Sequence, residues 1–294
     1  MVRAVLDRIF AAVLVAVHGA PAAPTAVIHR PAPPALIYPT QLSPGPSGLT
    51  AESYLSVDLA DGSVIFGRRP HQRRPIASLT KIMTGVLTAE AGGLDRRVRV
   101  PAAATKVEPN KDDLRAGGRY TRGMLLNSAL MISANDSAYA LGYDLGGGSM
   151  GRFYDLMNGA AADLRMGDTH YASANGLDDV RNRSSANDQA VVAWYALGDP
   201  TFRKIVGTKL KRVPWAAPVH LKEYRNHNRM LFGYRGTYGV KTGFTPGAGK
   251  CLVAAVQRGR TRVLVVLLDA DERWWTAAGV IEMAFDEAHA RQQR

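Results

Sequence analysis

One lysine decides how this chain is interpreted. It lies in residues 76–87, Ile-Ala-Ser-Leu-Thr-Lys-Ile-Met-Thr-Gly-Val-Leu, where Lys81 is the only charged side chain among apolar and small residues. Burial of an unpaired ammonium group costs several kcal/mol. The side chain therefore either extends its tip to solvent, which is the common outcome, or has a chemical role that outweighs this cost.

The composition is that of an ordinary globular protein with an excess of basic residues. The chain has 294 residues, 46% of them hydrophobic and 21% charged, with a formal net charge of +12. Such a charge suits an anionic partner, but no long basic run or aromatic-interleaved basic motif is present, so we expect no nucleic acid partner. The seven histidines show no ligand spacing, and Cys251 is the only cysteine. We therefore expect no metal, no cofactor and no disulfide.

The N-terminus is typical of an exported protein. Arg3 and Arg8 precede an apolar run at residues 9–17, and small residues follow. This order is that of a secretory signal peptide, and the run is too short to span a bilayer. We expect a signal peptide at residues 1–23, with an amphipathic first helix as the alternative. The proline-rich residues 24–48 predict an extended linker that is not packed.

Strand patterns lie at both ends of the remaining chain. Four apolar runs surround two turn signals, Asp61-Gly62 and residues 258–260, and the runs are residues 53–59, 64–66, 251–256 and 263–268. Residues 76 to about 206 have mostly helical patterns. Strands at both ends with helices between them predict an α+β fold, with one antiparallel sheet and an inserted helical half. A last helix at residues 274–290 is predicted to bury one face, formed by Trp275, Ala278, Ile281 and Phe285.

Ser78 gives Lys81 a possible chemical role. The two residues are three apart, and a helix that starts near Pro75 would place them on one face. A serine hydroxyl becomes a good nucleophile when a neighbouring base takes its proton. Lysine can be that base only if its pKa falls from about 10.4 towards neutrality, which burial, a helix N-terminus and a second cation favour. The spacing alone is common by chance, so a lysine that reaches solvent from a core helix stays the simpler interpretation.

Lys241, Thr242 and Gly243 offer the second cation. They lie in residues 239–246, which resemble a strand that runs into a turn, and Gly243 leaves room for close approach. A strand edge that ends in a bulge is the alternative interpretation.

A Ser-Ala-Asn triplet occurs three times, at residues 133–135, 173–175 and 185–187. The second precedes a loop, and the third suits the start of a helix, where serine is a capping residue. The first follows a strongly apolar helical run, which can hold polar side chains in a cleft. We therefore select Ser133 and Asn135.

Ser-x-x-Lys, Ser-x-Asn and Lys-Thr-Gly follow one another in the order typical of penicillin-recognising serine enzymes. The segments around them, residues 77–84, 131–138 and 239–246, resemble the low-molecular-mass penicillin-binding proteins that act as D-alanyl-D-alanine carboxypeptidases. The connecting segments 167–171, 175–179 and 226–231 resemble this family as well.

The resemblance covers about residues 50–290. It implies a serine β-lactamase/DD-peptidase-like fold, an antiparallel sheet flanked by helices with an inserted helical subdomain. It implies a catalytic domain at residues 49–291, with a sheet half at about 49–75 and 237–291 and a helical half at about 76–236.

The resemblance also implies the catalytic roles. Ser78 would attack the carbonyl carbon between the two terminal D-alanines of a peptidoglycan stem peptide, and Lys81 would accept its proton. The backbone N–H groups of Ser78 and Phe244 would bind the oxyanion. Ser133 would pass a proton to the departing amine.

Substrate binding is assigned by the same resemblance. Asn135 would bond the substrate amide and help to hold Lys81. Lys241 and Thr242 would hold the terminal carboxylate, with Gly243 and Phe244 completing the edge beside the substrate. β-Lactam antibiotics would act as acylating inhibitors.

Three alternatives remain beside the carboxypeptidase. A DD-endopeptidase that cleaves cross-links uses the same chemistry. A class A β-lactamase needs a glutamate between the Ser-x-Asn and Lys-Thr-Gly elements, with asparagine four residues later. The only glutamate in that interval is Glu223, and the residue four positions later is His227. An inactive wall-binding module would be free to lose the catalytic residues.

We also expect a monomer. Well-known members of the family continue into a β-rich domain and a membrane-lying helix, so the resemblance does not decide whether this protein attaches to a membrane. From the net charge we expect peripheral association with an anionic envelope.

Overall fold

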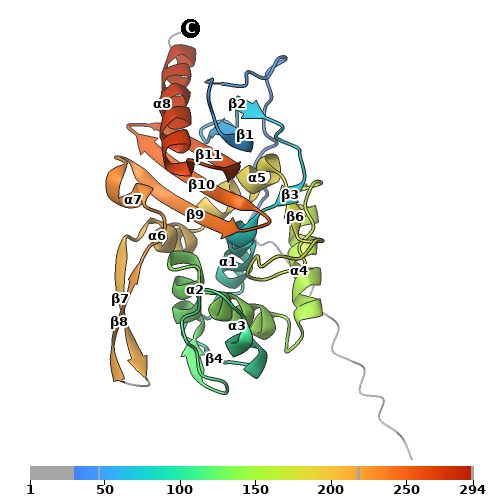
Figure 1. Cartoon of the computed structure of the whole chain (residues 1–294), viewed down its shortest axis with the longest axis vertical. Coiled ribbons are helices and arrows are strands. Elements are labelled where there is room, and N and C mark those ends of the chain that lie inside the picture. The colour runs from blue at the N-terminus through green and yellow to red at the C-terminus, as the bar shows by residue number, and fades with distance from the viewer. Residues whose placement is uncertain (1–29, 46, 217–218, 293–294) are drawn as a thin grey trace, which may run out of the picture.

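The computed structural model describes residues 30–45, 47–216 and 219–292. The predicted signal peptide lies outside these residues. The centre of the described part is a five-stranded antiparallel sheet in the order β2-β1-β11-β10-β9 (Figure 1). Its strands are β1 (Ala51–Asp58), β2 (Val64–Arg68), β9 (Thr237–Thr245), β10 (Gly249–Arg258) and β11 (Thr261–Ala270).

Both ends of the chain build this sheet, as predicted. The β1–β2 hairpin turns through Gly62, whose φ of +84° suits glycine. β1 then pairs antiparallel with β11, and Leu55 lies opposite Val266. Because successive side chains of a strand point to opposite faces, β10 sends Leu252 and Ala254 to one face and Val253 to the other. The sheet is therefore covered on both faces.

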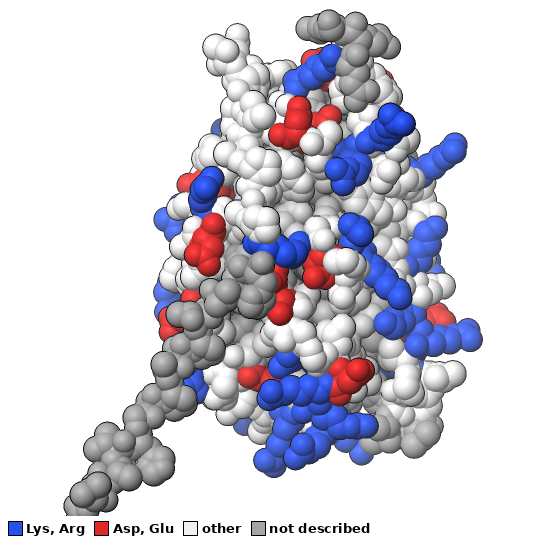
Figure 2. Space-filling model, turned by 180° about the vertical axis from the view of Figure 1, so that it is seen from behind, with Lys and Arg blue, Asp and Glu red and all other residues white. Residues whose placement is uncertain are grey.

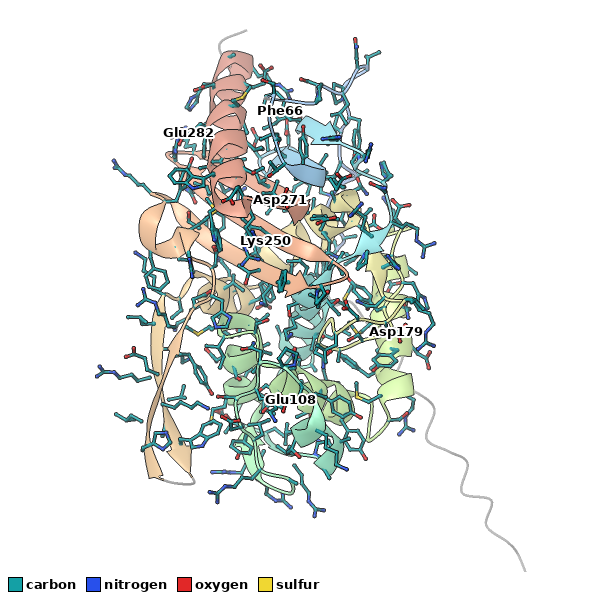
Figure 3. All side chains as sticks on the ribbon, viewed as in Figure 1. Phe66, Glu108, Asp179, Lys250, Asp271 and Glu282 are labelled. Atoms are coloured by element: carbon teal, nitrogen blue, oxygen red, sulfur yellow. The ribbon has the colours of Figure 1, made fainter. Side chains whose placement is uncertain are left out.

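Helix α8 (Arg273–Gln292) covers one face of the sheet. Arg258 of β10 donates to both carboxylate oxygens of Glu282, each over 2.6 Å. Figure 3 shows Glu282 on α8. The predicted burial of Ile281 and Phe285 is confirmed, but that of Trp275 is wrong, because its side chain is 79% exposed. Ala278 is only partly buried.

The buried stripe of α8 explains this difference. It consists of residues spaced three or four apart: Ala277, Val280, Ile281, Ala284, Phe285 and Ala288. Each helical residue turns the side-chain direction by about 100°. Trp275 lies two residues before Ala277, on the far side of the helix. Three small alanines in the stripe also let α8 approach the sheet closely.

The helical half covers the other face, except that Met230 packs on the α8 face. Its helices are α1 (Lys81–Glu90), α2 (Arg122–Met131), α3 (Asn135–Leu145), α4 (Met150–Asp163), α5 (Ala186–Leu197), α6 (Pro200–Gly207) and α7 (Met230–Gly233). α1 lies at the centre against α2, α3, α5 and α6 (Figure 1). A Cβ atom on its Gly85 would lie 2.8 Å from the ring of Phe202, so this glycine permits the α1–α6 contact.

Short strands and 3-10 turns complete this half. The pairs are β3 (Arg74–Pro75) with β6 (Arg183–Ser184), β4 (Arg97–Arg99) with β5 (Arg119–Thr121), and β7 (Leu210–Ala216) with β8 (Val219–Arg225). The 3-10 turns are η1 (Ala77–Thr80) and η2 (Ala102–Lys106). The β7–β8 hairpin was not expected, since residues 76–236 had been assigned to a helical half.

The part of the predicted linker that is described packs against the domain, which corrects the expectation of an unpacked segment. Arg30 pairs with Glu90 over 3.2 Å, and the Tyr38 hydroxyl donates to Asn187 over 2.8 Å. Ile37 forms a bridge with Ser63, and Leu42 packs against the core. None of the helices among the described residues has both the length and the apolar character needed to cross a membrane.

Candidate active site

Ser78 lies in the short turn η1, which leads directly into α1. The helix thus begins near Pro75 as predicted, but its first turn is a 3-10 helix. Ala77, the residue before Ser78, has a φ of +48°. Residues other than glycine adopt such a conformation at a cost of about 1–3 kcal/mol and are concentrated at functional sites. The turn leaves Ser78 partly exposed, whereas Lys81 is fully buried.

Three oxygen atoms surround the Lys81 amine. Its Nζ lies 2.8 Å from Ser78 Oγ, 2.7 Å from Asn135 Oδ1 and 2.6 Å from the backbone oxygen of Asn175. The side chain therefore does not reach solvent, so the simpler interpretation of the lysine is excluded. Its amine is held within hydrogen-bond reach of a serine hydroxyl, as a nucleophile and its base must be.

The surroundings of Lys81 favour the neutral amine. Burial lowers its pKa well below the usual value, the positive charge of Lys241 lowers it further, and Asp136 acts in the opposite direction. A neutral amine keeps a lone pair that accepts the Ser78 proton.

Ser133 lies at the junction of α2 and α3, where its backbone has a φ of +62°. Two hydrogen bonds from the Asn110 side chain hold this turn, to the backbone oxygens of Ile132 and Ser133, both over 2.8 Å. Asn135 begins α3, and its side-chain Nδ2 donates to the backbone oxygen of Pro109. Contacts with residues 109 and 110 therefore hold the turn, which places Ser133 and Asn135 in the site together.

Strand β9 supplies the second cation. Lys241 is almost fully buried, and its Nζ donates to Ser133 Oγ and to the Thr242 backbone oxygen, both over 2.9 Å. Burial lowers the pKa of Lys241 to about 7, and the charge of Arg273 contributes. The three predicted motifs therefore meet in two hydrogen-bonded sets: Lys81 joins Ser78 to Asn135, and Lys241 bonds to Ser133.

Gly243 brings the backbone of β9 against the nucleophile turn. A Cβ atom at this position would lie 3.0 Å from the Ile76 oxygen and 3.2 Å from the Ser78 nitrogen. Thr242 is buried, whereas the Phe244 side chain is 61% exposed. The backbones of Ser78 and of the Gly243–Phe244 edge are therefore neighbours.

Two contributors were not predicted from the sequence. The first is the loop at residues 172–182, whose Asn175 oxygen accepts from Lys81. Two hydrogen bonds tie this loop to η1 and α1, from Asn182 to Thr80 over 2.9 Å and from Thr84 to the Ala174 oxygen over 2.7 Å. The residue in the sequence that could have pointed to this loop is Gly176, whose backbone has a φ of +81° in the structure.

The second is Arg273, at the start of α8. Its guanidinium donates to the Gly243 oxygen over 2.8 Å and to the Cys251 oxygen over 3.3 Å. Together with Lys241 it gives this side of the site a positive charge that suits an anionic substrate group. Among the described residues, no three His, Cys, Asp or Glu side chains are grouped so that they could hold a metal ion.

Comparisons with known proteins give a family match. The profile of a family described as D-alanyl-D-alanine carboxypeptidase, peptidase S11, matches residues 40–272. The D-alanyl-D-alanine carboxypeptidase DacB2 of Mycobacterium tuberculosis is 30% identical over 79% of this chain and 79% of its own length. A D-alanyl-D-alanine endopeptidase of Escherichia coli is 30% identical over 76% of this chain and 72% of its own.

The fold has close counterparts among solved structures. The Streptomyces K15 DD-transpeptidase superposes with a TM-score of 0.77 at 28% identity, over 82% of this chain and 99% of that one.

Proposed function

This chain belongs to the D-alanyl-D-alanine carboxypeptidase family, peptidase S11, and has its DD-peptidase/β-lactamase-like fold; from this premise we propose that it is a serine-type carboxypeptidase. Its substrate is a peptidoglycan stem peptide, from which it removes the terminal D-alanine. The observation that carries the proposal is the buried Lys81 amine, 2.8 Å from Ser78 Oγ and next to a second buried lysine.

Acylation begins when Ser78 Oγ attacks the carbonyl carbon between the two D-alanines. Its proton passes to the neutral Lys81 amine as the new C–O bond forms. The oxyanion is bound by the backbone N–H groups of Ser78 and Phe244, and the closeness of Gly243 to the Ser78 nitrogen supports this pairing. Preorganised donors of this kind contribute about 3–4 kcal/mol each to transition-state stabilisation.

Collapse of the intermediate breaks the C–N bond. Ser133 protonates the departing amine and is reprotonated from Lys241 or Lys81, so that D-alanine leaves and the acyl group stays on Ser78. Lys241 and Thr242 bind the carboxylate of the leaving D-alanine, and Arg273 adds positive charge. Water then attacks the ester, the Ser78 oxygen leaves with a proton, and the shortened peptide is released.

Cleavage of cross-links is the second candidate activity. The similarity to an Escherichia coli D-alanyl-D-alanine endopeptidase, at the same 30% identity, favours it. A β-lactamase activity lacks support, because Glu223 lies on β8, half-exposed and paired with Arg212 over 3.2 Å. Penicillin should therefore remain on Ser78 as a long-lived acyl group. We further propose that residues 1–23 direct export and that the enzyme acts outside the cytoplasm.

A fluorescent penicillin tests the nucleophile. We expect a stable covalent adduct with the wild-type protein and none with Ser78→Ala, whereas the control Ser63→Ala, in the β1–β2 turn, labels normally. Rapid release of the drug would contradict the proposal in favour of a β-lactamase, and absence of any adduct would leave an inactive wall-binding module.

The preferred bond is tested with two substrates. D-Alanine release from a pentapeptide is measured beside cleavage of a cross-linked dimer, and the carboxypeptidase predicts the higher kcat/KM for the pentapeptide. A higher value for the dimer would replace this proposal with the endopeptidase.

A further inference from the structure

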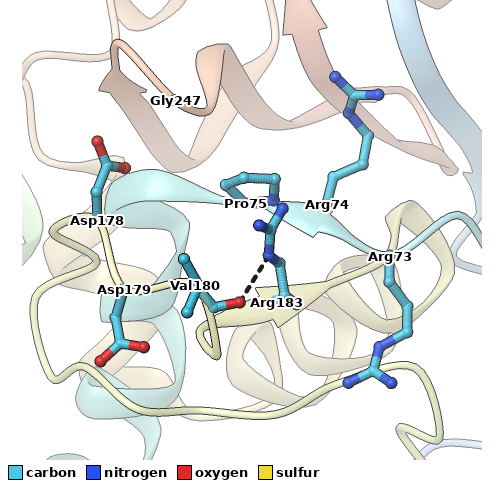
Figure 4. Close-up of a pocket in the computed structure, with 8 residues that line it drawn as sticks. All are labelled: Arg73, Arg74, Pro75, Asp178, Asp179, Val180, Arg183 and Gly247. Atoms are coloured by element: carbon cyan, nitrogen blue, oxygen red, sulfur yellow. Dashed lines mark hydrogen bonds between the residues drawn. The ribbon is translucent and has the colours of Figure 1, made fainter.

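A cavity of about 400 Å³ lies beside the candidate active site (Figure 4). Five of its eight lining residues are charged. The lining consists of Arg73, Arg74, Pro75, Asp178, Asp179, Val180, Arg183 and Gly247. None of these residues has a role in the proposed acyl transfer.

The segments that line the cavity also carry residues of the candidate active site. Pro75 precedes Ser78 by three residues, and Asp178 follows Asn175, the Lys81 partner, by three. The Thr245 hydroxyl of β9 donates to Asp178 over 2.6 Å. Since Thr245 is two residues beyond Gly243, the cavity begins ~7 Å along the strand from the Ser78 backbone.

The two walls of the cavity carry opposite charge. Figure 4 shows the carboxylates of Asp178 and Asp179 on one side and the guanidinium groups of Arg73, Arg74 and Arg183 on the other. The charges are therefore separated across the space that they line, and they do not pair with one another.

Part of this charge is already neutralised by neighbours outside the lining. Arg74 pairs with Asp269, and Asp179 pairs with Arg181 over 2.8 Å. Within the described residues, no carboxylate pairs with Arg73 or Arg183, and no cation pairs with Asp178. Arg183 is held in place by a hydrogen bond from its Nε to the Val180 oxygen, over 3.0 Å. One anion and two cations thus remain available to a ligand.

The direction in which the substrate peptide runs through the site follows from the proposed function, on which this inference rests. The leaving D-alanine carboxylate lies at the Lys241 end of the site, so the earlier residues of the peptide run along β9 towards Thr245. An extended peptide advances about 3.3 Å per residue. The residue before the acyl D-alanine therefore lies within reach of the cavity if its side chain is long.

We propose that this cavity binds the side chain of the stem-peptide residue before the acyl D-alanine, and that this side chain ends in an ammonium group and a carboxylate on the same carbon. The ammonium group faces Asp178, and the carboxylate faces Arg183 and Arg73. A side chain that ends in an amine alone leaves the two arginines unpaired, and one that ends in a carboxylate alone leaves Asp178 unpaired. The cavity thus selects a diamino dicarboxylic acid over lysine.

Three peptides test the selectivity. They are N-acetyl-meso-diaminopimelyl-D-Ala-D-Ala, the same peptide with its distal carboxylate amidated, and N-acetyl-L-Lys-D-Ala-D-Ala. We expect the wild-type kcat/KM for D-alanine release to be ~10-fold higher for the zwitterionic peptide, because only that peptide can pair with both Asp178 and the two arginines. A tenfold difference corresponds to about 1.4 kcal/mol. Equal values for the three peptides would overturn the proposal.

Two variants locate the selectivity in the cavity. Arg183→Gln should lower the preference for the free carboxylate over its amide ~10-fold. Asp178→Asn keeps an oxygen for the Thr245 hydroxyl and should weaken selection of the ammonium group. Arg260→Gln, an exposed arginine in the turn at the other end of β10, is the matched control and should keep the wild-type preference. If Arg260→Gln and Arg183→Gln lower it equally, the cavity is not the site.

Binding to Ser78→Ala separates this inference from the proposed function. Calorimetry with the same peptides measures affinity without turnover. If Ser78→Ala shows a zwitterion preference that an added Arg183→Gln substitution removes, while the wild-type protein releases no D-alanine from any of the peptides, the cavity is retained and the carboxypeptidase is rejected. D-Alanine release with no preference in either assay would retain the enzyme and reject the cavity.

Discussion

At the residue scale, Lys81 is stable in the core because the fold supplies everything that a buried amine needs. Three oxygens lie within 2.8 Å of its Nζ, and two of them come from segments more than fifty residues away. The backbone carbonyl of Asn175 and the side-chain oxygen of Asn135 compensate for lost water. The desolvation cost that these oxygens do not offset lowers the pKa of Lys81. A lowered pKa is what a base for Ser78 requires.

The pH dependence of acylation should report the two lysines. Protonated Lys81 accepts no proton from Ser78, so the rate rises with pH through the pKa of Lys81. Lys241, with a pKa of about 7 in the free enzyme, loses its charge above that pH and binds the substrate carboxylate less well. We expect a bell-shaped profile for the second-order rate constant of penicillin acylation between pH 5 and 10.

Lys241→Arg provides the check on this profile. A guanidinium group stays protonated throughout the range, so the descending limb should move to higher pH while the ascending limb stays. An unmoved descending limb in this variant would assign that limb to another group and contradict the role of Lys241.

Gly176 should be essential for the geometry of the nucleophile. Its φ is +81°, and a Cβ atom there would lie 1.9 Å from the Ala77 oxygen and 2.9 Å from the Ser78 nitrogen. Gly176→Ala should therefore lower the free energy of unfolding by about 2–4 kcal/mol and slow acylation at least tenfold. The control is Gly279→Ala on α8, where a Cβ atom meets nothing within 4 Å. It should raise stability by up to ~1 kcal/mol in denaturant unfolding. Similar effects of the two substitutions would contradict this explanation.

The sequence selected side chains that the fold brings together in the candidate site, but it did not select the backbone groups that lie beside them. Ser78, Lys81 and Lys241 could be selected because their residue types and order are specific for one chemistry. The Asn175 oxygen could not be selected, since a backbone carbonyl is the same at every residue and only folding places one beside Lys81. Arg273 was missed for a related reason, because nothing in its own segment marks it as a neighbour of Gly243.

At the element scale, the unexpected β7–β8 hairpin supports α3 through a buried carboxylate. Lys222 and Tyr224 of β8 both contact the Asp112 side chain, which is 1% exposed. The Asp112 N–H donates in turn to both oxygens of Asp136 on α3, over 3.0 and 3.1 Å. Asp136 follows Asn135 directly. The hairpin thus helps to hold the helix that presents a Lys81 partner.

Lys222→Met should destabilise the protein because it leaves the Asp112 carboxylate buried without its cation. Loss of one partner of a buried pair costs about 3–5 kcal/mol, and we expect about 1–3 kcal/mol here because Lys222 is a quarter exposed and Tyr224 remains. The double variant Lys222→Met/Asp112→Asn should recover part of this loss in urea unfolding. If the double variant shows the sum of the two single losses, the residues are not coupled.

Strand patterns were predicted well where both neighbours of a strand are also strands. β1, β10 and β11 have strong apolar character because the sheet is buried on both faces. β7 and β8 stand apart as a two-stranded unit with exposed Arg212 and Leu221, so their sequence lacks a clear burial pattern. Trp275 shows the opposite error, since a large apolar side chain was assigned to the core and is exposed.

At the scale of the whole molecule, the site forms where the two halves meet. β9 from the sheet half lies against η1, and α2 and α3 from the helical half deliver Ser133 and Asn135. Neither half contains a complete set of these groups, so the proposed chemistry requires the correct packing of one half on the other. Ala77 and Ser133, both with positive φ values, lie at this boundary.

The basic surface provides a test of association with an anionic envelope. Lys and Arg side chains gather at the end of the molecule where β4 lies (Figures 1 and 2). Arg97, Arg99 and Arg119 of the β4–β5 pair are exposed there, and Arg99 lies directly opposite Arg119. Like charges in that register destabilise a strand pair, so an anionic partner that neutralises them would be bound favourably.

Chromatography on immobilised poly-L-glutamate measures this association. We expect the wild-type protein to bind at 0.05 M salt and to elute as screening shortens the Debye length to about 8 Å near 0.15 M. The triple variant Arg97→Gln/Arg99→Gln/Arg119→Gln should elute at clearly lower salt. A second triple variant, Arg225→Gln/Arg229→Gln/Arg260→Gln, removes the same charge from other exposed positions and should elute close to the wild type. If both triple variants elute together, net charge alone determines binding and the β4–β5 surface has no special role.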